Sequence, residues 1–333
     1  MRITIVGDGG WGTALGLLLR QYGRDVTVWG PFADYVNEVR QRRENARFMP
    51  GVGLPPEIRW TADPAEACAG AGMAVLAVPS PFFADVCRRF CGVLPADVPV
   101  VSVTKGLDPA THRRMSAIAA AALGARRVAV LSGPSLAGEV ARGLPTAVVA
   151  AAADEALAVQ VQRLFSGPRF RVYTSTDPVG VELGGVVKNV IAIAAGVSDG
   201  LGFGDNTRAA LITRRLAEMT RLACSLGARA ETLSGLSCMG DLIVTCNSRQ
   251  SRNRGVGERL GRGEKLGDIL SGMRMVAEGV PNCRLVVDLA AEHGIDVPIS
   301  AQVCAICHGG QDPQQALISL MGRESKPEHG RRD

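Results

Sequence analysis

A basic side chain and a carboxamide interrupt a long apolar run in the middle of the sequence. Residues 186–197 are otherwise almost wholly apolar and predict a buried helix, in which Lys188 and Asn189 stand side by side. Lysine is rarely fully buried without a partner, because an unpaired charge is costly to remove from water. One interpretation is that Lys188 reaches water along its aliphatic stem. The other is that its ammonium group stays inside the protein to transfer a proton.

The composition favours the second interpretation. The chain has 37 lysine and arginine residues, of which only four are lysine, namely Lys105, Lys188, Lys265 and Lys326. Arginine cannot give up its proton, whereas the pKa of a buried lysine shifts readily and the residue can act as an acid or a base. Lys188 is therefore a candidate for catalytic proton transfer.

A glycine-rich turn lies near the start of the chain. Gly7, Gly9 and Gly12 occupy the positions of a G-x-G-x-x-G motif. The surrounding elements are predicted as a strand, a helix and a second strand at residues 2–7, 13–22 and 25–29. Glycine at these positions allows a tight turn, close approach of the backbone to a pyrophosphate at the helix N-terminus, and close packing of helix on strand. The pattern predicts dinucleotide binding.

The end of the second strand leaves the choice between NAD and NADP open. An NAD-specific site commonly has a ribose-binding carboxylate at this point, whereas an arginine would accommodate a 2′-phosphate. The sequence there is Trp29-Gly30-Pro31-Phe32, with Asp34 four residues after Gly30 and no arginine at the turn. Neither cofactor is therefore preferred on these residues.

The pattern of elements predicts an α/β fold, with a Rossmann-like, doubly wound, mostly parallel sheet followed by an all-helical second domain. Further strands are expected at residues 73–78, 98–103, 127–131, 146–151 and 169–174, with helices at 34–45, 82–91, 111–123 and 154–166. Later helices are expected at 206–226, 255–260, 278–293, 300–308 and 312–321. We predict a dinucleotide-binding domain at 1–180, a helical substrate domain at 181–321 and a solvated tail at 322–333.

Polar groups outside the glycine turn are candidates for substrate binding. Lys105 follows a predicted strand, where open α/β sheets bind ligands, although an ordinary exposed loop lysine fits the same position. Residues 248–254 form a polar, basic loop that suits anion capture or a simple solvated connection. Asp241, if near Lys188, could hold or tune its ammonium group.

Chain-wide properties exclude several classes of protein. A net charge of +5 is modest and spread out, which argues against nucleic acid but suits small anionic ligands. No apolar run is expected to approach the ~20 residues of a membrane helix, so stable membrane insertion is not expected. The N-terminus enters a strand at once, which predicts no signal peptide. Nine cysteines without framework spacing predict mostly buried thiols in a reducing cytoplasm.

One cysteine pattern matches a haem-attachment motif. Cys304-Ala-Ile-Cys307-His308 has the C-x-x-C-H spacing. The motif lies in a predicted helix with no export signal or axial-ligand candidate, so we expect neither haem nor a metal there.

Several motifs, in order, resemble the bacterial type of NAD(P)-dependent glycerol-3-phosphate dehydrogenase. The matching segments are residues 7–14, 132–137, 182–196, 202–209, 240–246 and 251–254. The resemblance implies interconversion of sn-glycerol 3-phosphate and dihydroxyacetone phosphate with NAD or NADP, feeding glycerophospholipid synthesis. Members often have a basic residue where Pro31 and Phe32 stand, so a preference for NADP is not transferable.

The resemblance also implies roles for individual residues. Lys188 would accept the proton in alcohol oxidation and donate it in ketone reduction. The substrate would be bound by Lys105, Gly133, Ser135, Lys188, Asp241, Ser251, Arg252 and Asn253. The cofactor would contact Gly7, Gly9, Gly10, Trp11, Gly12, Phe48, Lys105, Ala137, Arg252, Val276 and Glu278.

Two alternatives remain at this point. A dehydrogenase of the same architecture could act on a different acid or sugar through an equivalent lysine. A regulatory protein could bind NAD(P) without turnover, in which case Lys188 would be dispensable. The sequence also leaves a homodimer open.

Overall fold

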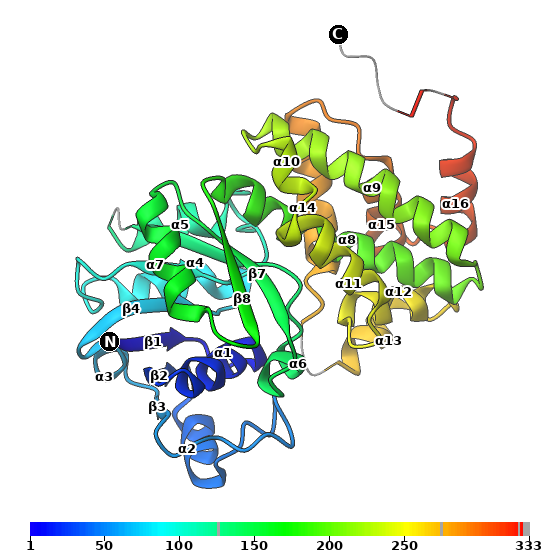
Figure 1. Cartoon of the computed structure of the whole chain (residues 1–333). Coiled ribbons are helices and arrows are strands. Elements are labelled where there is room, and N and C mark those ends of the chain that lie inside the picture. Colours follow the sequence, from blue (N-terminus) through cyan, green and yellow to red (C-terminus); the bar gives the residue numbers. More distant parts are fainter. Residues whose placement is uncertain (125–126, 274–275, 326, 329–333) are drawn as a thin grey trace. The chain divides into compact units, whose positions relative to one another are not determined.

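The computed structural model describes residues 1–124, 127–273, 276–325 and 327–328. The chain divides into two compact units (Figure 1), which we call the first unit, Met1–Lys188 with Met219–Thr245, and the second unit, Asn189–Glu218 with Cys246–Asp333. Helix α8, Pro178–Gly200, runs through residue 180 and contributes to both units. The predicted domain boundary at residue 180 stays a prediction.

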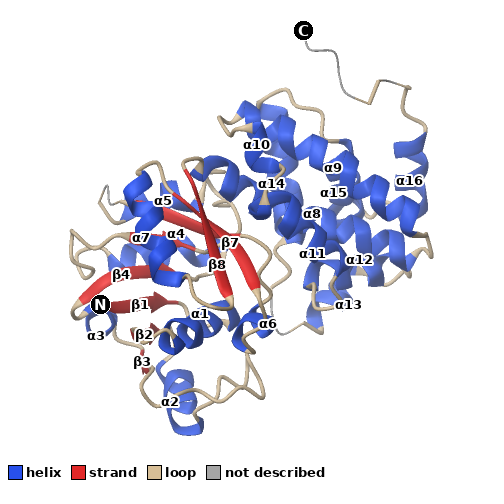
Figure 2. Ribbon diagram, in the orientation of Figure 1, coloured by secondary structure: helices blue, strands red, loops and turns tan. Residues whose placement is uncertain are grey.

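The first unit contains an eight-stranded sheet with the order β3-β2-β1-β4-β5-β6-β7-β8, shown in red in Figure 2. Its strands are β1 (Arg2–Val6), β2 (Asp25–Trp29), β3 (Arg59–Thr61), β4 (Ala71–Leu76), β5 (Val100–Ser102), β6 (Val128–Ser132), β7 (Thr146–Ala151) and β8 (Phe170–Ser175). Neighbouring strands are parallel except for β6 and β7. This sheet confirms the predicted fold class.

Helices cover both faces of this sheet. They are α1 (Gly10–Gln21), α2 (Ala33–Arg42), α3 (Pro64–Cys68), α4 (Ser80–Phe90), α5 (Met115–Ala122), α6 (Ala137–Ala141) and α7 (Glu155–Phe165). Strand β4 sends alternate side chains to opposite faces, as the pleat requires. Met73 and Val75 join the core cluster that contains residues of α1 and α7, whereas Ala74 and Leu76 join the cluster under α4 and α5. Two cores on one sheet define the doubly wound arrangement.

Two predicted helices are too long. The helix expected at 111–123 begins only at Met115, because the Asp108 carboxylate accepts hydrogen bonds from the backbone N–H and the hydroxyl of Thr111 and holds a turn there. The helix expected at 34–45 ends at Arg42, because Arg43 adopts the left-handed conformation with φ 51°. The short elements β3, α3 and α6 have too few residues for a periodic pattern and were not predicted.

Helix α8 is longer than the sequence pattern indicated. It has 23 residues and is the one described helix whose length and composition would allow it to cross a membrane. This corrects the expectation that no apolar run approaches ~20 residues. Some 88% of its most apolar window is buried in the protein, and a buried core helix meets the same criteria.

Two buried carboxylates anchor the first half of α8 in the first unit. Asp177 accepts hydrogen bonds from the backbone N–H groups of Gly180 and Arg229, each at 2.9 Å. Glu182 accepts hydrogen bonds from the Arg114 guanidinium at 2.7 Å and the Ser116 backbone N–H at 2.8 Å. These contacts fix the helix against α5 and against the start of α10 (Ala230–Leu233).

Glycines on α8 allow other elements of the first unit to approach it closely. A Cβ atom on Gly184 would lie 1.8 Å from the Cys238 Sγ, in the π-helix η1 (Leu236–Gly240). A Cβ atom on Gly185 would lie 3.3 Å from the Ser132 Oγ, which is tighter than most real contacts, and 3.4 Å from the Lys105 Cγ. Both glycines therefore leave space for residues that pack over the helix just before Lys188.

The second unit is helical, as predicted. Apart from the end of α8, its helices are α9 (Asp205–Ser225, whose last residues belong to the first unit), α12 (Arg252–Gly261), α13 (Leu266–Ser271), α14 (Gly279–Glu292), α15 (Pro298–Gly309) and α16 (Pro313–Met321). Helix α11 (Asp241–Asn247) begins in the first unit and ends in the second. In the predicted tail, residues 322–325 and 327–328 are exposed, and residues 326 and 329–333 lie outside the described residues.

Glycines also bring α8 and α12 together in the second unit. A Cβ atom on Gly196 would lie 2.0 Å from the Arg254 carbonyl oxygen, and one on Gly257 would lie 2.0 Å from the Ile193 carbonyl oxygen. Each helix therefore needs a residue without a side chain at the crossing. The close contact places the first turn of α12 beside α8.

Candidate active site

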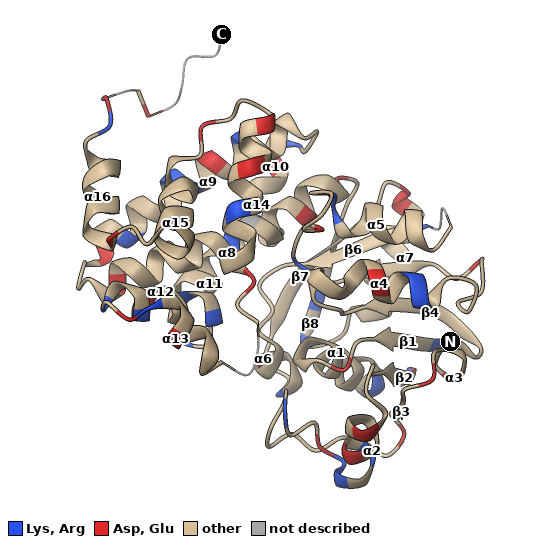
Figure 3. Ribbon diagram, turned by 180° about the vertical axis from the view of Figure 1, so that it is seen from behind, with Lys and Arg blue, Asp and Glu red and all other residues tan. Residues whose placement is uncertain are grey.

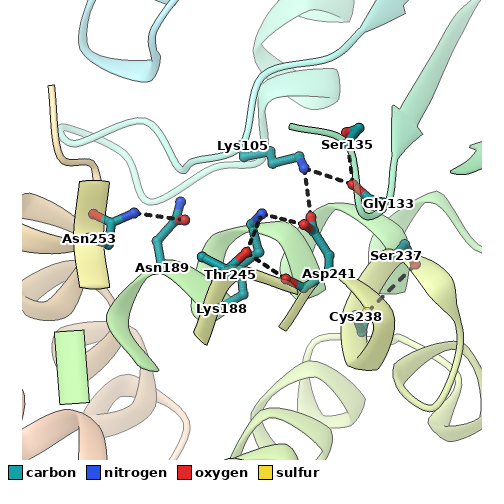
Figure 4. A network of polar contacts seen from close by, with 10 residues as sticks. All are labelled: Lys105, Gly133, Ser135, Lys188, Asn189, Ser237, Cys238, Asp241, Thr245 and Asn253. Atoms are coloured by element: carbon teal, nitrogen blue, oxygen red, sulfur yellow. Dashed lines mark hydrogen bonds and ion pairs between the residues drawn. The ribbon is translucent and has the colours of Figure 1, made fainter. Parts of the chain in front are cut away.

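Lys188 lies on α8 with its side chain buried, only 7% exposed. Its Nζ donates hydrogen bonds to the Asp241 Oδ1 at 2.5 Å and to the Thr245 Oγ1 at 3.1 Å (Figure 4). The partners are residues of α11, one helical turn apart, so they face the same side. The ammonium group is therefore held inside the protein by a carboxylate, and the interpretation that it reaches bulk water is wrong.

The other carboxylate oxygen of Asp241 pairs with a second lysine. The Lys105 Nζ lies 2.6 Å from the Asp241 Oδ2 and donates a hydrogen bond to the Gly133 carbonyl oxygen at 3.1 Å. That carbonyl also accepts a hydrogen bond from the Ser135 Oγ at 2.9 Å. Lys105 and Gly133 follow β5 and β6, at the carboxyl ends of those strands. The alternative that Lys105 is an ordinary exposed loop lysine is therefore wrong.

These charges tune the proton affinity of Lys188. Burial lowers the pKa of Lys188 to about 8, and the neighbouring Lys105 ammonium acts in the same direction, whereas Asp241 opposes both effects. One carboxylate faces two ammonium groups, so the cluster carries an excess positive charge while both are protonated. Loss of the Lys188 proton removes that excess. The arrangement suits a group that accepts and returns a proton near neutral pH.

Asp241 is predicted from the sequence as a partner of Lys188, whereas Thr245 is not. Thr245 is four residues after Asp241 on α11, and its hydroxyl also donates a hydrogen bond to the Asp241 carbonyl oxygen at 2.5 Å. The i, i+4 spacing was visible in the sequence, but α11 was not predicted as a helix. With that helix in place, the hydroxyl is fixed so that an oxygen lone pair faces the Lys188 ammonium.

The glycine-rich turn has the geometry that a pyrophosphate requires. Gly7 has φ 122°, in the region that favours glycine, and a Cβ on Gly12 would lie 2.1 Å from the Gly7 carbonyl oxygen. Gly9 is the N-cap of α1, a Cβ placed on it would meet no heavy atom within 4 Å, and the first turn of α1 has no acidic residue. Open space at a helix N-terminus whose first turn has no acidic residue fits an anionic dinucleotide.

The other cofactor residues of the first unit border this turn. Gly10 and Trp11 form the first turn of α1, and a Cβ on Gly10 would lie 2.9 Å from the Phe48 carbonyl oxygen. Ala137, the first residue of α6, packs on the same core cluster as Trp11 and Phe48. Of the candidate cofactor residues in the first unit, Gly10 and Trp11 therefore lie at the turn with Phe48 beside them, Ala137 packs on the same core cluster, and Lys105 lies at Asp241.

The predicted polar loop at 248–254 is in part a helix. Ser251 is the N-cap of α12, accepting a hydrogen bond from the Arg254 backbone N–H at 3.2 Å, so Arg252 and Asn253 lie in the first helical turn. Asn253 donates a hydrogen bond to the Asn189 side chain at 3.0 Å and accepts one from the Gly279 backbone N–H at 2.9 Å. The capping serine was the available signal for the helix start.

These residues form a separate cluster within the second unit. The exposed Arg252 donates a hydrogen bond from Nη1 to the Val276 carbonyl oxygen at 2.5 Å. Glu278 is the N-cap of α14, and its charge acts on Arg252. Arg254 instead pairs with Asp199 at 2.6 Å and is occupied in holding α12 to α8. Arg252 is therefore the exposed arginine of the first turn of α12, with no ion pair to a neighbouring helix among the described residues.

Charged residues and cysteines are spread over the described part of the chain. Figure 3 shows basic and acidic residues interspersed, with no described element basic along its whole length. Of the nine cysteines, six are buried, including Cys307. Within the described residues no group of three or more histidine, cysteine or acidic side chains could hold a metal ion.

Comparisons with known proteins place the chain in a family. Residues 2–158 match the family of the NAD-dependent glycerol-3-phosphate dehydrogenase N-terminus, and residues 177–318 match that of its C-terminus. The chain is 49% identical to the glycerol-3-phosphate dehydrogenase [NAD(P)+] of Geobacter sulfurreducens, over 98% of both chains. It is 46% identical to that of Streptomyces avermitilis, also over 98% of both.

A solved structure agrees with these relatives. The fold superimposes on the crystal structure of glycerol-3-phosphate dehydrogenase from Coxiella burnetii with a TM-score of 0.93 and 41% identity, covering 97% of this chain and 99% of that one. The resemblance seen in the sequence is thus confirmed over nearly the full length. The chain belongs to the family of NAD(P)-dependent glycerol-3-phosphate dehydrogenases.

Proposed function

We propose that the chain interconverts sn-glycerol 3-phosphate and dihydroxyacetone phosphate with NAD(P)(H), and that Lys188 is its catalytic acid and base. The observation that carries the proposal is the buried Lys188 ammonium group, 2.5 Å from Asp241, with a lowered pKa. An alcohol oxidation needs a group that takes the hydroxyl proton, and this amine has the position and proton affinity for that task. Nicotinamide, when bound, supplies or accepts the hydride.

The protein contributes to the reaction by positioning the substrate and by transferring a proton. In the oxidative direction the neutral Lys188 amine would take the proton of the carbinol hydroxyl, and the bound cofactor would accept the hydride of the carbinol carbon. In the reductive direction the Lys188 ammonium returns a proton to the carbonyl oxygen. We assign Lys105, Gly133, Ser135 and Asp241 to holding the substrate and the lysine, and Ser251, Arg252 and Asn253 to the phosphate group.

The cofactor is assigned to the glycine-rich turn. Gly7, Gly9, Gly10, Trp11 and Gly12 supply open backbone at the N-terminus of α1, which suits the pyrophosphate. The remaining proposed contacts are Phe48, Lys105, Ala137, Arg252, Val276 and Glu278.

A lowered pKa for Lys188 predicts opposite pH profiles in the two directions. Below a pKa of about 8 the amine is protonated and cannot act as a base, so kcat/KM for glycerol 3-phosphate oxidation should rise with pH and level off above that value. Reduction needs the ammonium form, so its kcat/KM should fall above the same pH. Initial rates over a pH series at constant ionic strength test this. A flat oxidation profile across neutrality would remove Lys188 as the base.

Arg252→Ala should raise the KM for the phosphorylated substrate by about 10- to 100-fold, with a smaller effect on kcat, because a charge-assisted hydrogen bond to phosphate is lost. Arg262→Ala is the matched control, since Arg262 follows the other end of α12 with its side chain 61% exposed. Discrimination against unphosphorylated glycerol should shrink only in the Arg252 variant. Unchanged discrimination would argue against phosphate capture.

The direct test of the activity is an absorbance assay of dihydroxyacetone phosphate reduction with NADH and, separately, with NADPH. Reduction of a different ketone acid, with none of dihydroxyacetone phosphate, would favour a related dehydrogenase instead. Binding of cofactor without turnover of any ketone would favour a regulatory protein.

We further propose a cytoplasmic role in supplying glycerol 3-phosphate for glycerophospholipid synthesis. The family membership supports this role. Expression of the chain in a bacterial strain that requires glycerol 3-phosphate should restore growth without that supplement, whereas the Lys188→Ala variant should not. A homodimer remains open, and size-exclusion chromatography with light scattering decides it.

A further inference from the structure

A buried carboxylate lies at the end of β2, although the sequence has no acidic residue there. Asp8, the second residue of the glycine-rich turn, is only 9% exposed. Its Oδ2 would lie 2.4 Å from a Cβ atom on Gly30, the residue that follows β2. Gly30 therefore leaves the space that the Asp8 side chain occupies. The carboxylate reaches, from the end of β1, the point where β2 of an NAD-specific fold commonly provides one.

The surrounding residues hold the Asp8 backbone in place and leave the carboxylate oxygens available. The Asn45 side chain donates hydrogen bonds to the Asp8 carbonyl oxygen and to the Thr13 hydroxyl, both at 2.7 Å. The Tyr35 hydroxyl in turn donates to the Asn45 side chain at 2.5 Å. Within the described part of the chain, no other residue donates a hydrogen bond to the carboxylate oxygens of Asp8. The backbone N–H of Asp8 itself meets one acceptor site, and a carboxylate offers about four, so the others remain for a ligand.

We propose that Asp8 is a specificity-determining residue that binds the adenosine ribose hydroxyls of the cofactor, so that the enzyme prefers NAD(H) over NADP(H). A carboxylate accepts hydrogen bonds from a free ribose diol and repels a 2′-phosphate. The inference deepens the proposed function, since it concerns the cofactor of the same site. It adds a residue to that site that neither the motif nor the resemblance indicated.

A nearby arginine, Arg47, favours binding of a 2′-phosphate, in opposition to Asp8. The Arg47 guanidinium stacks over the Tyr35 ring at 4.7 Å from its centre, and its charge acts on Asp8. Arg47 is exposed, so water and salt screen its field, whereas the buried Asp8 acts through a medium of lower dielectric constant. In the native chain the repulsion of a 2′-phosphate by Asp8 therefore outweighs its attraction by Arg47. Without it, Arg47 would be left to attract a 2′-phosphate.

Burial also affects the protonation of this carboxyl group. Burial raises the pKa of Asp8 to about 6, against the opposing effect of a hydrogen bond from its own backbone N–H and of Arg47. At pH 7.5 the carboxylate is therefore mostly ionised. The binding measurements below belong at that pH, where the negative charge is present.

The test measures binding of NADH and NADPH by calorimetry in the absence of substrate. The native protein should bind NADH more tightly than NADPH. Asp8→Asn should raise the affinity for NADPH relative to NADH by at least about 10-fold, since it removes a charged acceptor and its repulsion. In Asp8→Asn combined with Arg47→Met, most of the gain for NADPH should disappear.

Asp34→Asn is the matched control. Asp34 is exposed and lies four residues after Gly30, where it is the other carboxylate that could bind the ribose. Its replacement by asparagine changes the net charge by the same amount as Asp8→Asn. The control should alter the NADH to NADPH ratio by no more than about 2-fold. Gly30→Ala is a second variant that tests the position of the carboxylate, because the added Cβ must displace the Asp8 side chain while its charge is kept. It should shift the NADH to NADPH ratio in the same direction as Asp8→Asn.

Three results would overturn the proposal: tighter binding of NADPH by the native protein, an unchanged ratio in Asp8→Asn, or an equal shift in Asp34→Asn. Because the measurement contains no substrate, it is separate from the proposed reaction. A protein that prefers NADH but does not reduce dihydroxyacetone phosphate would retain this inference and refute the proposed function.

Discussion

Lys188→Ala is expected to lower turnover by at least about 10²- to 10⁴-fold in both directions while cofactor binding is retained, because positioned proton transfer contributes about that much. The loss should appear in kcat, since the amine acts on the reacting hydroxyl rather than on the phosphate. Stopped-flow measurement of NADH oxidation with saturating dihydroxyacetone phosphate gives the rate. Calorimetric titration with NADH shows that the cofactor still binds.

Two further variants separate proton transfer from other effects. Lys188→Met keeps the length of the stem and fills the same apolar space, so it should be as inactive as the alanine variant without leaving a cavity. Lys265→Ala removes an exposed lysine that precedes α13 and should leave turnover unchanged. Near-normal turnover in the methionine variant would refute the assignment of Lys188 as acid and base.

Asp241→Asn should have the second-largest effect, on both stability and activity. The Asp241 side chain is 1% exposed and is the shared counter-charge of Lys105 and Lys188. Removing one partner of a buried ion pair leaves an uncompensated charge and costs about 3–5 kcal/mol in the free energy of unfolding. Urea denaturation followed by circular dichroism measures this loss.

The effect of Asp241→Asn on activity follows from the direction of the pKa shift. Asp241 raises the pKa of Lys188 against the effect of burial, so its removal should lower that pKa further. The ammonium form would then be lost at lower pH, and the fall in dihydroxyacetone phosphate reduction should move to more acidic pH. A pH profile displaced to higher pH, or not displaced, would contradict this role of Asp241.

An exposed ion pair of the first unit is the matched control for stability. Asp85 pairs with Arg88 on α4, and its side chain is 72% exposed. Asp85→Asn makes the same chemical change as Asp241→Asn, but should alter the free energy of unfolding by no more than about 1 kcal/mol. Equal losses in the two variants would mean that the buried cluster does not stabilise the fold. The Lys188→Met and Asp241→Asn effects should also be non-additive, because the two groups are in contact.

Elements whose signals are local could be predicted from the amino-acid sequence. The glycine-rich turn, the apolar strands and the amphipathic helices depend on residues a few positions apart, so the mostly parallel sheet and the helical second half were predictable. The scarcity of lysine together with the apolar run around Lys188 indicated a functional amine before any contact was known. Element boundaries were less certain, as the late start of α5 at Met115 shows, because side-chain hydrogen bonds set them.

Contacts between groups that are distant in the sequence could not be predicted and are known from the folded chain. Lys105 and Asp241 are 136 residues apart in sequence, and no periodicity relates them, yet they share an ion pair. Thr245 faces Lys188 only because α11 forms. Asp8 stands at the end of β2 because parallel pairing brings the ends of β1 and β2 together and Gly30 leaves it room. Burial and proximity of charges arise from packing, and they set the proton affinity on which the proposed chemistry depends.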